Sequence, residues 1–95
     1  MGLGKTVQVL ALLEARRQEG AGPSLVVVPR SLLFNWVREA ERFAPALRVH
    51  VHHGPERDAR GEGLLAADVV LTTYGTLRQD ASALRQLSFD YAVLD

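Results

Sequence analysis

The first residues of the chain combine glycines, a lysine and a threonine in a pattern suited to binding phosphate. Gly4-Lys5-Thr6 follows Gly2, and together they match the second half of the GxxxxGK[ST] phosphate-binding pattern. Glycine lets backbone N–H groups approach an anion closely. Lys5 would place its charge on the β and γ phosphates, and the Thr6 hydroxyl would bind magnesium. Because Gly-Lys-Thr also occurs by chance at helix starts, this interpretation needs a second observation.

Asp95, at the other end of the chain, is that second observation. It follows four apolar or aromatic residues, 91–94, which are typical of a strand. A carboxylate at the end of such a strand can hold Mg²⁺, usually through water, beside a phosphate loop. An acid that simply ends a surface strand would look the same. Its occurrence together with Lys5 and Thr6 favours a nucleotide site.

The composition indicates one small globular domain and does not indicate any class of binding partner. The 95 residues are 47% hydrophobic and 23% charged, which is ordinary for a folded chain. Eleven basic residues balance eleven acidic ones, so binding to nucleic acid would depend on a local patch. The absence of cysteine excludes disulfides and thiolate metal sites. No apolar run reaches the ~20 residues of a membrane span, and the start lacks the basic-then-apolar order of a signal peptide.

Helical and strand patterns alternate along the chain. The apolar run at 24–28 is typical of a strand covered on both faces, and Ser31 is a favourable N-cap for the helix that follows. The alternation predicts an α/β fold, a parallel sheet with helices on both faces, in which ligands gather at the carboxyl ends of the strands. Helices are predicted at 6–18, 32–43 and 76–87, with a short one within 56–66, and strands at 24–28, 48–52, 68–72 and 91–95.

Five stretches form a longer pattern: 1–8 (MGLGKTVQ), 28–36 (VPRSLLFNW), 53–54 (HG), 68–74 (DVVLTTY) and 89–95 (FDYAVLD). In this order and spacing they resemble the first ATPase lobe of the Swi/Snf-type DNA translocases, in the DEAD/DEAH-like helicase superfamily. The resemblance covers essentially the whole chain, and its middle stretches are more specific than Gly-Lys-Thr. It identifies residues 1–95 as a partial RecA-like P-loop lobe, cut inside the phosphate loop and at the acid of the DEAD/DEAH box.

The resemblance implies a lobe that binds ATP and Mg²⁺ against a second RecA-like lobe and uses hydrolysis to move along duplex DNA. Carried over to this chain, Lys5 and Thr6 would hold phosphates and magnesium, and Asp95 would hold magnesium. The family's general base is the glutamate after this acid, so residues 1–95 alone are expected not to hydrolyse ATP at a useful rate. A cytoplasmic, nucleoid-associated bacterial protein with no membrane partner is expected.

Two turns at the expected carboxyl edge of the sheet are candidate DNA contacts. In the helicase superfamily the motif at Ser31 meets the DNA backbone, and a helix start can bind an anion. Thr72, Thr73 and Tyr74 occupy the next such turn, where hydroxyls can bond phosphate oxygens and position the strand. A plain helix cap is the alternative role for Ser31. Trp36 lies on an apolar helical stripe and is expected in the core, not stacked on a base.

Other interpretations stay open. A different P-loop protein, such as a kinase or transporter ATPase, would share the loop, and an orphan fragment would bind nothing well. His50, His52 and His53 are expected on a half-solvated strand and its turn. Neighbouring arginines and the lack of cysteine disfavour a metal site there. The mixed charges between 56 and 62 are expected to form a solvated face.

Overall fold

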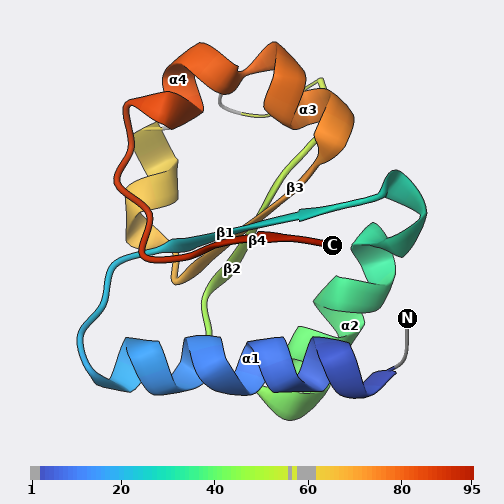
Figure 1. Ribbon diagram of the computed structural model, residues 1–95, viewed down its shortest axis with the longest axis vertical. Coiled ribbons are helices and arrows are strands. Elements are labelled where there is room, and N and C mark those ends of the chain that lie inside the picture. The colour runs from blue at the N-terminus through green and yellow to red at the C-terminus, as the bar shows by residue number, and fades with distance from the viewer. Residues whose placement is uncertain (1–2, 56, 58–61) are drawn as a thin grey trace.

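The computed structural model describes residues 3–55, 57 and 62–95, which form three layers (Figure 1). Strands β1 (Ser24–Val28), β2 (Val49–His52), β3 (Val69–Thr73) and β4 (Ala92–Leu94) make one parallel sheet in the order β2-β3-β1-β4. Helices α1 (Leu3–Gln18) and α2 (Leu33–Phe43) cover one face. Helices α3 (Tyr74–Gln79) and α4 (Ala81–Arg85), with the 3-10 helix η2 (Glu62–Ala66), cover the other. The predicted α/β fold with a parallel sheet is confirmed.

The central strand β1 is apolar after Ser24 because both of its faces are covered. Successive side chains of a strand point to opposite faces, and all five residues of β1 are buried. Val26 and Val28 belong to the cluster under α1 and α2, whereas Leu25 and Val27 belong to the cluster under α4 and η2. The first cluster also contains Leu10, Leu13, Leu33, Trp36, Ala40, Val69 and Leu71, and the second also contains Leu64, Ala67, Val70 and Leu84.

The start of α2 differs from the prediction. Residues Arg30–Leu32 form a 3-10 turn, η1, in which the Leu32 N–H donates to the Pro29 carbonyl at 2.9 Å. The N-cap position of α2 is therefore Leu32, which makes no side-chain capping bond. The prediction of Ser31 as the N-cap is wrong, because the backbone turn after Pro29 places Ser31 inside a helical turn.

The predicted helix at 76–87 is two short helices that meet at Asp80. Thr73 caps α3, and its Oγ1 accepts from the Thr76 N–H at 3.3 Å. The Asp80 N–H closes α3 by donating to the Thr76 carbonyl at 2.9 Å, and α4 then begins at Ala81. The chain changes direction at Asp80, whose side chain is buried.

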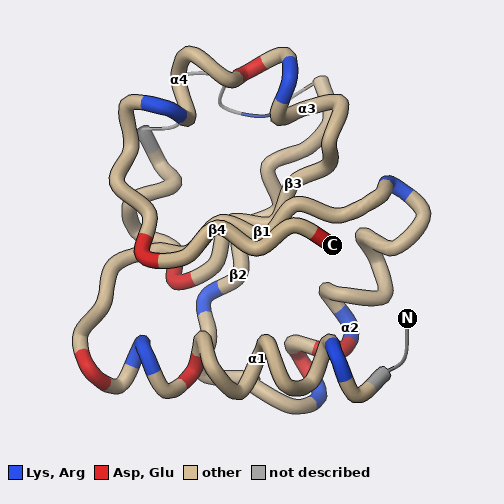
Figure 2. Tube along the Cα trace, viewed as in Figure 1, with Lys and Arg blue, Asp and Glu red and all other residues tan. Residues whose placement is uncertain are grey.

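Charges of both signs are scattered along the trace, and neither sign gathers in one part of it (Figure 2). This distribution agrees with the equal numbers of acidic and basic residues. Within the described ranges, no helix is both long enough and apolar enough to cross a bilayer. Any contact with a polyanion therefore depends on particular residues at one edge and not on overall charge.

Candidate nucleotide site

The fold brings Lys5 and Asp95 together. Lys5 lies in the first turn of α1, and Asp95 directly follows β4. The Lys5 Nζ is 3.0 Å from the Asp95 Oδ1, although 90 positions separate the two residues. The Asp95 side chain is 4% exposed and the Lys5 side chain is 50% exposed. A half-solvated ammonium thus reaches a buried carboxylate, which is the juxtaposition that a phosphate and magnesium site needs.

Asp95 is held by contacts from three other elements. Its backbone N–H donates to the Val27 carbonyl at 2.8 Å, which extends the β1–β4 pairing to the carboxyl edge of the sheet. The Trp36 Nε1–H donates to Asp95 Oδ2 at 3.1 Å, and the Tyr74 hydroxyl donates to the Asp95 backbone oxygen. Trp36 is buried, which confirms its predicted place in the core. Helical spacing could assign Trp36 to an apolar stripe, but it could not show that a carboxylate lies opposite.

The first turn of α1 contains two further residues of the predicted site, Gly4 and Thr6. A Cβ built on Gly4 would meet no atom within 4 Å, so the space beside this turn is open. Thr6 is buried in the same turn. A hydroxyl and a carboxylate are hard oxygen ligands of the kind that Mg²⁺ prefers. These residues therefore have the donor chemistry that a magnesium-bound phosphate group needs; Gly2, the remaining predicted member of the site, lies outside the described residues.

The predicted DNA contacts share the carboxyl edge with Asp95 but differ in access. Ser31 is exposed, and Tyr74 is 40% exposed. Thr72 is fully buried, and its hydroxyl donates to the His52 carbonyl at 2.7 Å. Thr73 is buried as well, with its hydroxyl engaged in the cap of α3. Of the four predicted DNA contacts, only Ser31 and Tyr74 therefore present their side chains to solvent.

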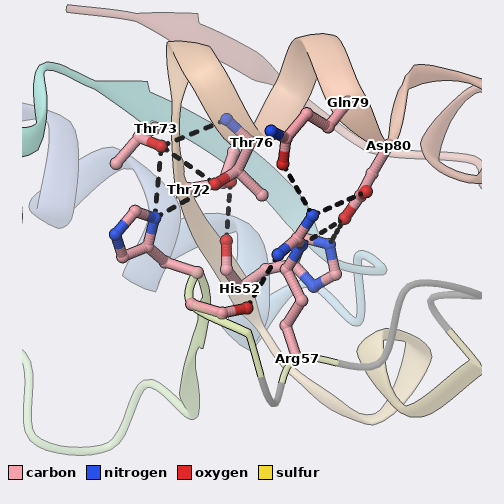
Figure 3. Close-up of polar contacts among 9 residues, drawn as sticks. His52, Arg57, Thr72, Thr73, Thr76, Gln79 and Asp80 are labelled. Atoms are coloured by element: carbon pink, nitrogen blue, oxygen red, sulfur yellow. Dashed lines mark hydrogen bonds and ion pairs between the residues drawn. The ribbon is translucent and has the colours of Figure 1, made fainter.

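A second polar cluster, which the sequence did not reveal, lies where β2 ends (Figure 3). Asp80 accepts two bonds from Arg57, at 2.6 Å from Nε and 3.1 Å from Nη2, and lies 2.7 Å from His52 Nε2. Arg57 also donates to the Gly54 carbonyl and to Gln79. The only available signal was the presence of three charged or titratable residues on segments that the predicted sheet brings close together.

This cluster corrects two expectations. His52 is fully buried and not half-solvated, and the Arg57 side chain is only 17% exposed, although it was expected on a solvated face. The hydrogen bonds from Arg57 hold the pKa of the Asp80 carboxyl below its usual range, against the opposing effect of burial. The same pairing raises the pKa of Arg57. Among the residues with described positions, no group of three or more His, Asp or Glu side chains is arranged to hold a metal ion.

Known proteins resemble this chain in both sequence and fold. The ATP-dependent helicase fft2 of Schizosaccharomyces pombe is 42% identical over the whole chain, and an uncharacterised ATP-dependent helicase of Mycoplasma pneumoniae is 41% identical. The chain spans 8% and 10% of their respective lengths. The Sulfolobus solfataricus SWI2/SNF2 ATPase core in complex with dsDNA matches the whole chain at 40% identity with a TM-score of 0.87, over 20% of its own length. The SNF2-related domain family matches residues 1–95, and the chain belongs to this family.

Proposed function

We propose that this chain is part of the ATP-binding lobe of a DNA-dependent ATPase that moves along duplex DNA. The observation that carries the proposal is the ion pair between Lys5 in the first turn of α1 and Asp95 after β4. It joins the two residues that the family's phosphate loop and acidic strand end would supply. The related archaeal core was solved with duplex DNA, which supports the choice of DNA as the partner.

In the nucleotide-bound state, the Lys5 ammonium would leave Asp95 and bind the β and γ phosphates instead. That exchange would free the Asp95 Oδ1, so that Asp95 and Thr6 could hold Mg²⁺, while Gly2 and Gly4 would leave the backbone N–H groups accessible. Magnesium would neutralise negative charge on the phosphate oxygens. A second RecA-like lobe would complete the site, and residues 1–95 alone would hydrolyse ATP slowly.

The DNA backbone would lie along the edge formed by the ends of β1 and β3. Ser31 and Tyr74 are proposed to contact phosphates directly, because their side chains are exposed. The Tyr74 hydroxyl would release the Asp95 backbone oxygen to donate to a phosphate. Thr72 and Thr73 are proposed to support the turn that presents Tyr74, because their hydroxyls are buried as well as bonded inside the protein. Such contacts would position the duplex without reading its sequence, which suits a cytoplasmic, nucleoid-associated motor.

The test is ATP hydrolysis by the full-length protein with and without duplex DNA. We expect Lys5→Ala to lower the DNA-stimulated rate by about 100-fold or more, as loss of a phosphate-stabilising group does. Ser31→Ala should leave the maximal rate and raise the DNA concentration for half-maximal stimulation about five-fold, the effect of roughly 1 kcal/mol. Arg48→Ala, at an exposed position away from this edge, is the matched control.

The outcomes separate the competing functions. Hydrolysis that DNA stimulates and Lys5→Ala abolishes would support the translocase. Hydrolysis that ignores DNA would instead support another P-loop ATPase and would remove the roles proposed for Ser31 and Tyr74. An intact full-length protein without any ATPase activity would overturn the proposal.

A further inference from the structure

Two side chains outside the nucleotide site converge on Asp95. One comes from a candidate DNA-facing turn, and the other comes from the helix that follows the second such turn. Trp36 lies on α2, which follows the turn that contains Ser31, and its Nε1 is 3.1 Å from Asp95 Oδ2. Tyr74 is the first residue of α3, and its hydroxyl donates to the Asp95 backbone oxygen. The residue proposed to hold magnesium is therefore bonded to the turn that contains Tyr74 and to the helix that directly follows the turn of Ser31.

The two carboxylate oxygens of Asp95 have different partners. Oδ1 accepts from Lys5, and Oδ2 accepts from the indole of Trp36. The indole N–H is a neutral donor, so it can hold Oδ2 without adding a positive charge that would repel a cation at Oδ1. Trp36 is only 2% exposed and packs in the cluster between α1, α2 and the sheet. A donor fixed in this way sets the direction in which Oδ1 points.

A shift of either turn would also change the contact that its helix makes with Asp95. Ser31 and Trp36 are joined through η1 and the first turn of α2, so a shift of Ser31 toward a phosphate would displace the indole as well. Tyr74 lies directly after Thr73, the cap of α3, so a change in that turn would move its hydroxyl relative to Asp95. Coupling between sites needs packed elements of this kind that link one site to the other.

We propose that Trp36 and Tyr74 are positioning residues that couple DNA contact at the two turns to the orientation of Asp95. The proposal rests on the function proposed above and adds the route between its two sites. Because coupling free energy is reciprocal, magnesium nucleotide should tighten DNA binding by the factor by which DNA tightens nucleotide binding. Loss of either contact should reduce that factor, even where both ligands still bind.

Trp36→Phe and Tyr74→Phe in the full-length protein test this route, since each keeps an aromatic ring and removes one donor. The first readout is the Mg²⁺ concentration for half-maximal ATP hydrolysis without DNA. We expect Trp36→Phe to raise it about 10-fold, as removal of a bond that orients a metal ligand does. The second readout is the Kd for duplex DNA with and without Mg²⁺ and a non-hydrolysable ATP analogue. We define the Kd ratio as the Kd without Mg²⁺ and the analogue divided by the Kd with them. For both variants we expect this ratio to fall from at least about five toward one.

The control is Leu84→Val, a buried change on α4 in the cluster on the other face of the sheet, away from both contacts to Asp95. It should lower the melting temperature while leaving the Mg²⁺ requirement and the Kd ratio at their wild-type values. If it alters them as much as Trp36→Phe does, the contacts are merely structural and the inference is overturned. If Trp36→Phe does not fold, the Kd ratio of Tyr74→Phe still tests the inference, because a change at this half-exposed position should not prevent folding.

The remaining outcomes separate this inference from the proposed function. The inference is overturned if the variants keep the wild-type Mg²⁺ requirement and Kd ratio. If the wild-type protein still hydrolyses ATP with DNA stimulation, the proposed function is supported all the same. A wild-type protein that neither hydrolyses ATP nor binds DNA overturns both. Retained binding of each ligand alone, with the Kd ratio lost in both variants, supports the inference.

Discussion

Replacement of Asp80 by Asn should destabilise the fold more than any change at a surface ion pair. Asp80 accepts two bonds from Arg57 and lies 2.7 Å from His52 Nε2, and its side chain is 7% exposed. His52 is fully buried, and its Nδ1 meets no partner among the described residues. The bond to Asp80 is therefore the single polar contact of this ring within the described structure.

The expected loss is about 3 kcal/mol. Breaking a buried ion pair by removing one partner costs roughly 3–5 kcal/mol. The lower end applies here, because Arg57 is 17% exposed and keeps its bonds to Gly54 and Gln79. An asparagine oxygen can still accept one bond, but its amide group faces the Arg57 and His52 donors. For a domain of this size, 3 kcal/mol corresponds to a fall in melting temperature of about 12 °C or more.

Thermal and urea unfolding of residues 1–95, followed by circular dichroism, would measure this loss. The control is Glu19→Gln, which removes a partner of Arg16 at a position that is 65% exposed and should cost under about 0.5 kcal/mol. A loss below about 1 kcal/mol for Asp80→Asn, or equal losses in the two variants, would refute the reasoning. Water would then already screen the cluster, and Arg57 would behave as part of a solvated face.

Three further changes test separate parts of the fold by the same unfolding measurements. Stability should decline below about pH 4: arginine hydrogen bonds lower the folded-state pKa of Asp80 and Asp90, so their contribution is full above the unfolded-state pKa near 3.9 and is lost as pH falls through the lowered values. A urea midpoint unchanged between pH 6 and pH 3 would contradict this. Leu10→Ala, in the core under α1, should cost about 3 kcal/mol by leaving a cavity, and a loss under about 1 kcal/mol would mean that this core is loosely packed. Thr73→Ala should cost about 1 kcal/mol through loss of the α3 cap, and an unchanged melting temperature would show that the cap contributes nothing.

The elements that depend on local pattern could be predicted from the sequence. The apolar run at 24–28 gives a strand buried on both faces because alternate residues contact opposite clusters. Lys5 and Asp95 could be paired because parallel strands end at one edge, and a helix start there suits phosphate. Their 3.0 Å contact agrees with that expectation.

The features that the sequence could not predict are decided by long-range contacts. Asp80 interrupts an otherwise periodic helix because its carboxylate pairs with Arg57 and His52 across the end of β2. Periodicity reports which residues are apolar, not which acid will find a buried arginine. Ser31 was misassigned for a different reason. A serine before a helix predicts a cap, but the extended Pro29 allows a 3-10 turn that supplies the backbone bonds instead.

The position of Asp95 depends on more than its strand. β4 is only three residues long and, among the described strands, pairs with β1 alone. Leu94, just before Asp95, is 64% exposed, so packing of the strand fixes its carboxyl end weakly. The bonds from Lys5, Trp36 and Tyr74 come from the start of α1, from α2 and from the start of α3. Because these elements meet only when both faces of the sheet are covered, the nucleotide site forms together with the fold. A variant that loses nucleotide binding therefore identifies a ligand-binding residue only when its melting temperature matches that of the wild-type protein.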